Sequence, residues 1–296
     1  MVVDEITDSP GQLVPRRALG GAPSYSSMAL SSLGYDPEIV THVGEDFPKE
    51  YSQFIKKNTG LELQKWIAPG FKTTSYRIDR SGPKRRLWLQ AKCRDLTFED
   101  FDSFLEKSSA TSIVLNPVAN EISLPLLEKV SKKFNLVFAD SQGFVRRFDE
   151  KTAEALMRSG LDISLLKNLK VLKADLEELR AWTGIGLKES AIAEISVYVD
   201  ILLLTSGPAV VEVYEGGKLK MKAAPFKVIV ADTTGAGDIM LSSFAAKFTE
   251  SGDIGKALAF SVSASTLAIR NYGIEKGLLS KEEVEKKSSL VEISSF

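Results

Sequence analysis

Seven consecutive residues, Asp232-Thr233-Thr234-Gly235-Ala236-Gly237-Asp238, combine the residue types that phosphoryl transfer needs. The Gly-Ala-Gly turn has no bulky side chain, so its backbone N–H groups are open to an anion, and a carboxylate follows at Asp238. The apolar, β-branched run 226–230 predicts a strand, and apolar residues at helical spacing over 239–248 predict a helix. We therefore expect the turn at a helix N-terminus, which attracts anions, with Asp238 placed to accept a proton from an attacking hydroxyl. For the Gly-Ala-Gly-Asp part alone, a tight strand-to-helix turn capped by an aspartate is the alternative.

The middle of the chain alternates between strand-like and helical stretches, which predicts right-handed βαβ crossovers and a parallel sheet covered on both faces. Ligands bind such sheets beyond the carboxyl ends of the strands. Polar residues follow the predicted strands at that edge, namely Asn116, Asp140, Asp175, Ser206 and Asp238. The predicted strands are 112–115, 136–139, 170–173 and 201–205, and the predicted helices are 124–134, 151–158, 176–182 and 189–198.

Two further segments predict β-hairpins. Residues 73–79 and 84–91 flank Ser81-Gly82-Pro83, and residues 210–214 and 218–222 flank Glu215-Gly216-Gly217. The first hairpin precedes the βαβ region, as expected for a small sheet that projects from the main domain. The charged run 281–287 predicts a solvated helix face rather than a binding patch.

The composition excludes several classes of protein. The 296 residues are 44% hydrophobic and 26% charged, as in a globular protein with a sizeable core. Lys and Arg number 38 against 39 Asp and Glu, which argues against binding to nucleic acid or to a membrane surface. The single cysteine, Cys93, and the single histidine, His42, allow neither a disulfide framework nor a Cys–His pair. Without a signal-peptide core or a membrane-length apolar run, the predicted location is cytoplasmic.

Two other motifs could bind small ligands or cations. Gly20-Gly21-Ala22-Pro23 precedes a helical stretch, and the glycine pair would let the backbone approach a ligand closely; an ordinary loop is the alternative. Asp175 and Glu178 lie three residues apart at a strand-to-helix junction, so both can face one opening. A hydrated Mg²⁺ would suit two such carboxylates beside phosphates, whereas a capping box at the helix start is the alternative.

The loop 140–146 offers a carboxylate, an amide, a glycine and a guanidinium after a predicted strand. A polyhydroxylated ligand needs such a mixture of hydrogen-bond donors and acceptors. The alternative is a polar loop with Phe144 in the core. P-loop chemistry is not expected, because a Walker A sequence is absent.

The full string Asp232–Asp238 resembles the C-terminal signature of the PfkB (ribokinase-like) family of sugar and nucleoside kinases. Other motifs follow in that family's order. The family's N-terminal sugar-binding signature is resembled by Gly20-Gly21, Ala29, Leu33-Gly34 and Val43-Gly44-Glu45-Asp46. Its Asn-x-x-Glu motif is resembled by Asp175-x-x-Glu178, and its nucleotide-binding loop by Thr205-Ser206-Gly207. The turn beside the adenine is resembled by Asn271-Tyr272-Gly273. The chain departs from the family pattern at Ser24, Tyr25 and Ser26, where an Asn is common, at Asp175, and at Ile239-Met240-Leu241.

The resemblance implies one ribokinase-like α/β domain over residues 1–296, with three αβα layers, a mostly parallel central sheet and a small β-lid. The lid is expected mainly at 71–92, with a contribution from 5–19. The implied reaction transfers the ATP γ-phosphoryl group, with Mg²⁺, to a hydroxyl of a small polyol or sugar. The implied roles are catalysis for Asp238, Gly235, Ala236 and Gly237, cofactor binding for Lys173, Thr205, Ser206, Gly207, Thr234 and Asn271, substrate binding for Asp4, Gly20, Gly21, Asn116, Asp140 and Gln142, and metal binding for Asp175 and Glu178.

Within the family, the loop 140–146, the Asp-x-x-Glu form and Asn116-Pro117 most resemble the inositol-kinase-like branch, so myo-inositol is the expected acceptor. A nucleoside or ribose-type sugar is the alternative, with Tyr76 and Trp88 as candidate stacking residues. A non-catalytic sugar-binding protein on the same fold is the alternative of another class. Exposed edges of a lid sheet favour a homodimer through the lid. Because Val2-Val3-Asp4 resembles the end of the family's first strand, we also expect that the natural protein begins further upstream.

Overall fold

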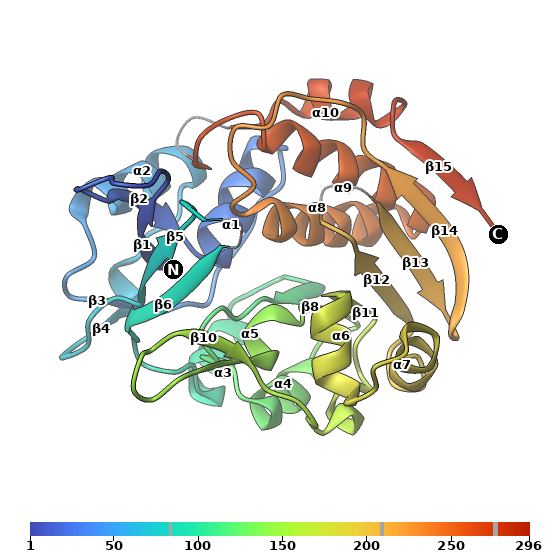
Figure 1. The fold of residues 1–296 in the computed structure, drawn as a ribbon, viewed down its shortest axis with the longest axis horizontal. Coiled ribbons are helices and arrows are strands. Elements are labelled where there is room, and N and C mark those ends of the chain that lie inside the picture. The colour runs from blue at the N-terminus through green and yellow to red at the C-terminus, as the bar shows by residue number, and fades with distance from the viewer. Residues whose placement is uncertain (83–84, 208–209, 275–277) are drawn as a thin grey trace.

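The computed structural model describes residues 1–82, 85–207, 210–274 and 278–296. Its body is a seven-stranded sheet with the strand order β15-β14-β13-β12-β11-β8-β7 (Figure 1). The pairs β7–β8, β8–β11 and β11–β12 are parallel, whereas β12–β13, β13–β14 and β14–β15 are antiparallel, so β13 and β15 run against the other five strands. The strands are β7 (Ser112–Leu115), β8 (Leu136–Asp140), β11 (Val171–Asp175), β12 (Ile201–Thr205), β13 (Val211–Glu215), β14 (Lys218–Ala224) and β15 (Glu292–Ser295).

Alternating side chains along these strands build two apolar cores, one on each face. Leu172 and Leu202 face one core, and their neighbours Val171 and Ile201 face the other. Helices cover both faces, which confirms the predicted three layers (Figure 1). One layer contains α4 (Leu124–Ser131), α6 (Leu176–Thr183) and α7 (Lys188–Ile195), and the other contains α8 (Ala236–Ser251) and α9 (Ile254–Ala268). The remaining helices are α1 (Ala22–Ser32), α2 (Lys49–Thr59), α3 (Phe98–Leu105), α5 (Gln142–Val145) and α10 (Lys281–Ser288).

A separate four-stranded sheet, called the small sheet below, has the order β2-β1-β5-β6. Two of its strands lie within residues 71–92, which the sequence assigns to a lid, and the other two overlap residues 5–19 only in part; Pro83 and Lys84 of the expected hairpin turn lie outside the described residues. The first and last strands of the sheet are its edges. The strands are β1 (Val2–Thr7), β2 (Arg16–Gly20), β5 (Ser75–Asp79) and β6 (Arg86–Ala91), and a further two-residue pair joins β3 (Val43–Gly44) to β4 (Ile67–Ala68).

Two predicted elements are wrong. Residues 151–158 do not form a helix, because Asp149 Oδ1 accepts the N–H groups of Lys151 (3.0 Å) and Thr152 (2.8 Å) and closes a turn instead. This turn joins β9 (Arg146–Phe148) to the antiparallel β10 (Ala155–Met157). Residues 226–230 do not form a strand either, because β15 already pairs with β14 along that edge, and Ile229 is 90% exposed.

The β9–β10 hairpin contacts the β6 edge of the small sheet. Leu89 N–H donates to Ala153 O (2.9 Å), Trp88 forms an antiparallel bridge with Glu154, and Arg86 binds the Glu154 carboxylate through two bonds of 2.9 Å each. One edge of the small sheet is therefore partly covered by the same chain. No helix within the described ranges is long and apolar enough to cross a membrane.

Candidate active site

Strand register brings the polar residues at the carboxyl ends of the central strands into one row. Leu115, which precedes Asn116, pairs with Ala139; Asp140 pairs with Lys173; and Asp175 pairs with Thr205. Phe138 and Val171 face α8, so alternation also turns Asp140 and Lys173 toward the α8 side. The sheet thus carries a row of oxygen and nitrogen groups to the N-terminus of α8.

The Gly235-Ala236-Gly237 turn begins α8 as the sequence predicts. Gly235 caps the helix in the left-handed conformation (φ 77°), and a Cβ there would lie 2.2 Å from the Tyr25 ring. Ala236 N–H makes a long bond to Thr233 O (3.3 Å). Within the described chain, the N–H groups of Gly235, Gly237 and Asp238 donate to no protein atom, so they remain open to an anion.

We expect Gly235→Ala to destabilise the protein by roughly 2–5 kcal/mol, because left-handed strain adds to the collision with Tyr25. Gly252→Ala is the matched control, since Gly252 ends the same helix at φ 66° and nothing lies within 4 Å of its added Cβ. Urea unfolding of both variants measures the difference. Equal losses would show that Tyr25 yields without cost.

Asp238 lies in the first turn of α8, and Asn116 Nδ2 donates to its Oδ1 over 2.9 Å. Burial raises the pKa of Asp238 to about 6, with a further rise from Asp140, whereas Lys173, the Asn116 bond and Arg146 act in the opposite direction. A carboxylate with this pKa is ionised at neutral pH and still basic enough to accept a proton. Asn116 Oδ1 is buried without a hydrogen-bond partner in the described chain, so it is available to a ligand hydroxyl.

Lys173 supplies a buried cation beside the turn. Its Nζ donates to Asp140 Oδ2 over 2.6 Å and would lie 3.0 Å from a Cβ at Gly237. Burial alone would lower the pKa of Lys173, but the carboxylates of Asp140, Glu178 and Asp238 together raise it. Lys173 therefore stays charged next to the open N–H groups of α8. Asp140 is held by Lys173 and by Gln142 N–H (3.0 Å) rather than standing free.

Asp175 and Glu178 form the capping box that the sequence left as the alternative. Asp175 Oδ1 accepts Glu178 N–H (2.8 Å), and Glu178 Oε2 accepts both Asp175 N–H (2.9 Å) and Ser141 Oγ–H (2.5 Å). Burial, and next the charge of Asp140, raise the pKa of Glu178 to about 7. Asp175 and Glu178 supply only oxygen donors, the type of ligand that Mg²⁺ prefers. No cluster of three or more His, Cys, Asp or Glu side chains suited to a metal occurs among the described residues.

The small sheet carries Asp4 on β1, near Tyr25. A Cβ on Gly20 would lie 2.1 Å from Asp4 Oδ2, so the glycine makes room for this carboxylate, and Gly21 caps α1 directly after it. Burial raises the pKa of Asp4 to about 6, although Arg85, Arg80, Arg146 and Arg16 act against the rise. The Tyr25 pKa is raised by burial and by the nearby charges of Asp4, Asp232 and Asp238. Tyr25 is therefore close enough to both Asp4, the predicted substrate-binding carboxylate, and Asp238, the predicted base, to feel their charges.

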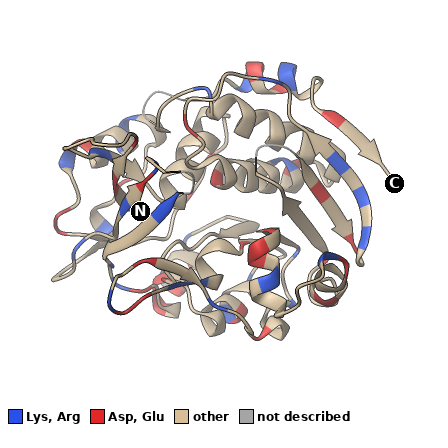
Figure 2. Cartoon of the chain, in the orientation of Figure 1, with Lys and Arg blue, Asp and Glu red and all other residues tan. Residues whose placement is uncertain are grey.

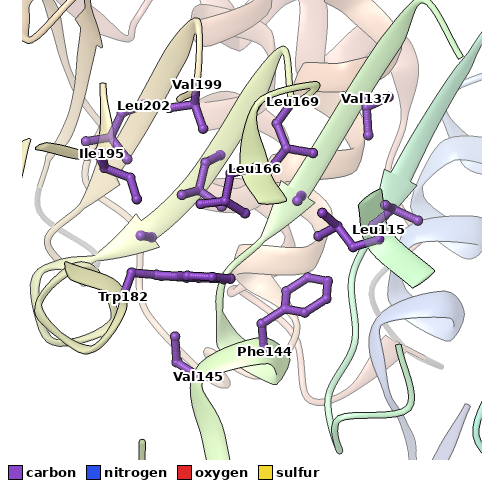
Figure 3. Packing of buried hydrophobic residues seen from close by; sticks show 14 of the residues in the cluster. Leu115, Val137, Phe144, Val145, Leu166, Leu169, Trp182, Ile195, Val199 and Leu202 are labelled. Atoms are coloured by element: carbon purple, nitrogen blue, oxygen red, sulfur yellow. The ribbon is translucent and has the colours of Figure 1, made fainter. Parts of the chain in front are cut away.

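The residues expected to bind a nucleotide are less closely grouped. Thr205 Oγ1 donates to Ala174 O (3.3 Å) at the end of β12, and Ser206 and Gly207 follow it. Thr234 accepts a hydrogen bond from Arg80 in the signature turn. Asn271 lies in an exposed turn after α9, where its N–H donates to Ala268 O (3.3 Å). Gln142 begins α5, where Phe144 packs against Trp182 (ring centroids 6.1 Å apart; Figure 3).

Sequence reasoning missed Asp232 as a site residue. Asp232 Oδ1 accepts Thr234 N–H (2.9 Å) and Arg80 Nη1 (3.0 Å), so it joins the signature turn to the small sheet. Asp232 and Arg80 lie 152 residues apart in the chain, so no local sequence spacing links them. The only signal was the type of residue, a second aspartate at the start of the string.

A cavity of about 580 Å³ lies behind this site rather than in it. It runs along the edge strand β7 between α1 and α8, and it reaches the row of polar groups only at Asn116. The buried Met1 ammonium lies at its wall and donates to Thr41 Oγ1 (2.8 Å). The acid–base chemistry is therefore assigned to the row of strand ends and not to the cavity.

Comparison with known proteins gives a family match over most of the chain. The model of the family described as pfkB family carbohydrate kinase matches residues 14–281. The 2-dehydro-3-deoxygluconokinase of Thermoproteus tenax is 25% identical over 96% of this chain and 90% of its own. The ribokinase of Bacillus subtilis is 34% identical over 33% of each chain.

Solved structures share the fold. A pyrophosphate-dependent kinase in the ribokinase family, complexed with a pyrophosphate analogue and myo-inositol, superposes with a TM-score of 0.76 at 22% identity, over 96% of this chain and 99% of that chain. Ribokinase of Arabidopsis thaliana, complexed with ribose and ATP, gives a TM-score of 0.73 at 18% identity, over 97% and 95%. The predicted ribokinase-like architecture is confirmed.

Proposed function

The chain belongs to the pfkB family of carbohydrate kinases and phosphorylates an alcohol group of a sugar or polyol, and from this premise we propose how it does so. The donor is ATP, used with Mg²⁺, and Asp238 is the general base. The observation that supports this most is Asp238 itself, a buried carboxylate with a raised pKa beside open N–H groups of a helix N-terminus.

The proposed reaction is an in-line displacement. Asn116 Oδ1 and Asp4 hold acceptor hydroxyls, and Asp238 takes the proton from the reacting hydroxyl. The acceptor oxygen then forms a bond to the γ-phosphorus, while the bond from that phosphorus to the bridging oxygen breaks and ADP leaves. The N–H groups of Gly235 and Gly237 and the Lys173 ammonium stabilise the charge on the transferring group.

Asp175 and Glu178 would hold Mg²⁺ through their carboxylates, directly or through water. A bound Mg²⁺ neutralises charge on the donor phosphates.

Acceptor-dependent release of ADP from ATP tests the proposal. The assay would use a panel of myo-inositol, ribose, fructose, fructose 6-phosphate and nucleosides, with and without Mg²⁺. We expect turnover with at least one sugar or polyol and none when Mg²⁺ is chelated. Ligand binding without turnover across the panel would favour the alternative of a non-catalytic sugar-binding protein.

The fall of kcat/KM at low pH, the acid limb of the pH profile, should report the ionisation of the general base, Asp238. Because Asp238 must be ionised, kcat/KM should fall tenfold per pH unit below an apparent pKa of about 6. Asp4 and Glu178 titrate nearby, so the limb belongs to a coupled set. Asn116→Leu removes a bond that favours the carboxylate and should move the limb to higher pH. An unmoved limb would contradict the assignment to Asp238.

The finer choice of acceptor rests on the loop 140–146. Its resemblance to inositol kinases supports myo-inositol, and the occurrence of a myo-inositol complex among the similar structures agrees with that choice. A nucleoside or ribose-type sugar remains the alternative. For a nucleoside, however, Tyr76 is buried in the small sheet with its hydroxyl bonded to Val118 O (2.8 Å), and Trp88 stacks with Arg77 and Arg86. Because of these contacts, neither ring is free to stack on the base of a nucleoside.

A homodimer through the small sheet is a further part of the proposal. The β6 edge is partly covered by β9–β10, so pairing would use the β2 side, where Leu13 and Val14 are 96% and 77% exposed. Analytical ultracentrifugation of the wild type and of Leu13→Glu would test this. The cytoplasmic location stays a prediction.

A further inference from the structure

The cavity behind the row of strand ends is bordered by an unpaired edge of the central sheet. β7 is the last strand of this sheet and pairs only with β8. In a parallel pair, alternate N–H and C=O groups of each strand point away from the partner. Residues 112–115 line the cavity, and no backbone hydrogen bond among the described residues joins them to a segment other than β8. The outward backbone groups of β7 are therefore available for a further strand.

A second unpaired segment, residues 36–42, lines the same cavity. It is neither helix nor strand, and within the described chain its backbone makes no hydrogen bond to another backbone group. Its side chains are nevertheless arranged as in a strand at the border of a core: Asp36 and Glu38 are exposed, whereas Ile39 and Val40 pack against buried apolar residues. Because backbone groups inside a protein need partners, two such borders around one cavity call for a strand that pairs with them.

The Met1 nitrogen lies at the wall of this cavity. Val3 N–H donates to Thr74 O (3.0 Å), and Val2 packs against Val118, which follows β7 closely in the chain. These contacts place Met1 near the carboxyl end of β7. Burial lowers the pKa of the Met1 ammonium, and Thr41 Oγ1 (2.8 Å) accepts one of its three N–H groups. A peptide nitrogen at this position would carry no charge, and its single N–H would be satisfied by Thr41.

The walls of the cavity are mainly apolar and reach both faces of the sheet. Phe101 belongs to the core that Leu172 faces, and Ala245 belongs to the core that Val171 faces, and both line the cavity. The helix α1, which also contributes to the wall, has no charged residue (Figure 2). A strand buried on both faces of a parallel sheet is a nearly continuous apolar run. The walls therefore fit a strand rich in Val, Ile or Leu.

We propose that the cavity is the site of one further β-strand, a run of about six apolar residues that precedes Met1 in the natural protein and pairs with β7. A strand that ends at Met1 runs toward the carboxyl end of β7, so the two are parallel, and its other edge is offered to residues 36–42. The peptide bond to Met1 then continues the strand directly into β1. This inference does not rest on the proposed kinase function.

The intact mass of the protein purified from its native source tests whether such a strand belongs to this chain. We expect a mass that exceeds the 32.4 kDa of the 296-residue chain by at least six residues. A mass of 32.4 kDa would overturn the proposal, because no residues would then precede Met1.

Two extended variants test where the strand binds. Six residues of Val and Ile are placed before Met1 in one variant, and six residues of Gly and Ser in the other. The Val/Ile extension should raise the Tm by roughly 10 °C, because it buries apolar surface, and the Gly/Ser extension should leave it unchanged. Amide hydrogen exchange in residues 38–41 and 112–115 should slow at least tenfold with the Val/Ile extension alone. Exchange in β12 is the internal control, since this strand is already paired on both sides.

Ala246→Phe, introduced into the chain that starts at Met1 and into the Val/Ile variant, separates binding in the cavity from binding elsewhere. Ala246 lies on the cavity wall, so a phenylalanine there should cancel the gain of the Val/Ile variant without lowering the Tm of the unextended chain. Equal effects in both backgrounds would contradict the proposal, as would equal Tm and exchange for the Val/Ile and Gly/Ser variants. Slower exchange only with a free Val/Ile peptide would assign the cavity to a separate chain and overturn it too. None of these measurements depends on phosphoryl transfer.

Discussion

Replacing Asp238 by Asn should lower kcat by roughly 10²–10⁴-fold, because the variant keeps the shape of the side chain but cannot accept the proton of the acceptor hydroxyl. KM should change little if Asn116 still bonds the new amide. Asp200→Asn is the control, since Asp200 is an exposed carboxylate just before the amino end of β12, away from the carboxyl ends of the strands, and is paired with Lys170. ADP release under saturating acceptor measures the effect. Near-normal turnover would refute the assignment of the base.

The same variant should be more stable than the wild type at pH 8. The folded protein holds the Asp238 proton to a pKa of about 6, above the ordinary 3.8, so ionisation of this group weakens the fold as the pH rises from about 4 to about 6, and the loss stays constant above that range. At about 1.4 kcal/mol per pKa unit, the neutral Asn should gain roughly 2–3 kcal/mol at pH 8 and less at pH 5. Urea unfolding at both pH values checks this and shows that lost activity is not lost folding.

Lys173→Met should have the largest effect on stability. The substitution leaves Asp140, Glu178 and Asp238 buried without their shared cation, and the loss of one partner of a buried pair costs roughly 3–5 kcal/mol. Urea unfolding at pH 8 measures the loss. It should shrink at pH 5, where the raised pKa values of Glu178 and Asp238 let these groups bind protons.

Two comparisons isolate the buried charge. Lys170→Met breaks a pair of similar length, Lys170–Asp200 (2.9 Å), at the exposed start of the same strand, and should cost less than about 1 kcal/mol. The double variant Lys173→Met, Asp140→Asn removes both partners and should recover most of the stability. Equal losses for Lys170→Met and Lys173→Met, or no recovery in the double variant, would show that packing rather than charge governs the site.

Local patterns predicted those parts of the fold that depend on neighbours in sequence. The apolar spacing after Gly237 located α8, and the alternation of strands and helices located the row formed by Asn116, Asp140 and Asp175. The run 226–230 shows the limit of such patterns. It has strand-forming residues, but a strand needs a free edge, and β15 from the C-terminal end of the chain occupies the one beside β14.

The electrostatics of the site could not be predicted from sequence. The pKa of Asp238 depends on Asn116, which is 122 residues away in the chain, and on burial that only the packed layers create. The pairing of Asp232 with Arg80 likewise joins distant segments. The motif named the groups that we propose take part, and their pKa values depend on the tertiary structure.

The contacts between β6 and the β9–β10 hairpin have a consequence for motion. The small sheet cannot rotate as a rigid flap about the chain connections alone, because its outer strand is bonded at Leu89 to Ala153 and at Arg86 to Glu154. Any rotation must either break these bonds or bend the hairpin that begins at Arg146. While these bonds hold, opening of the small sheet displaces the hairpin that carries Arg146, and exchange of the Leu89 amide with solvent requires that its bond to Ala153 O break.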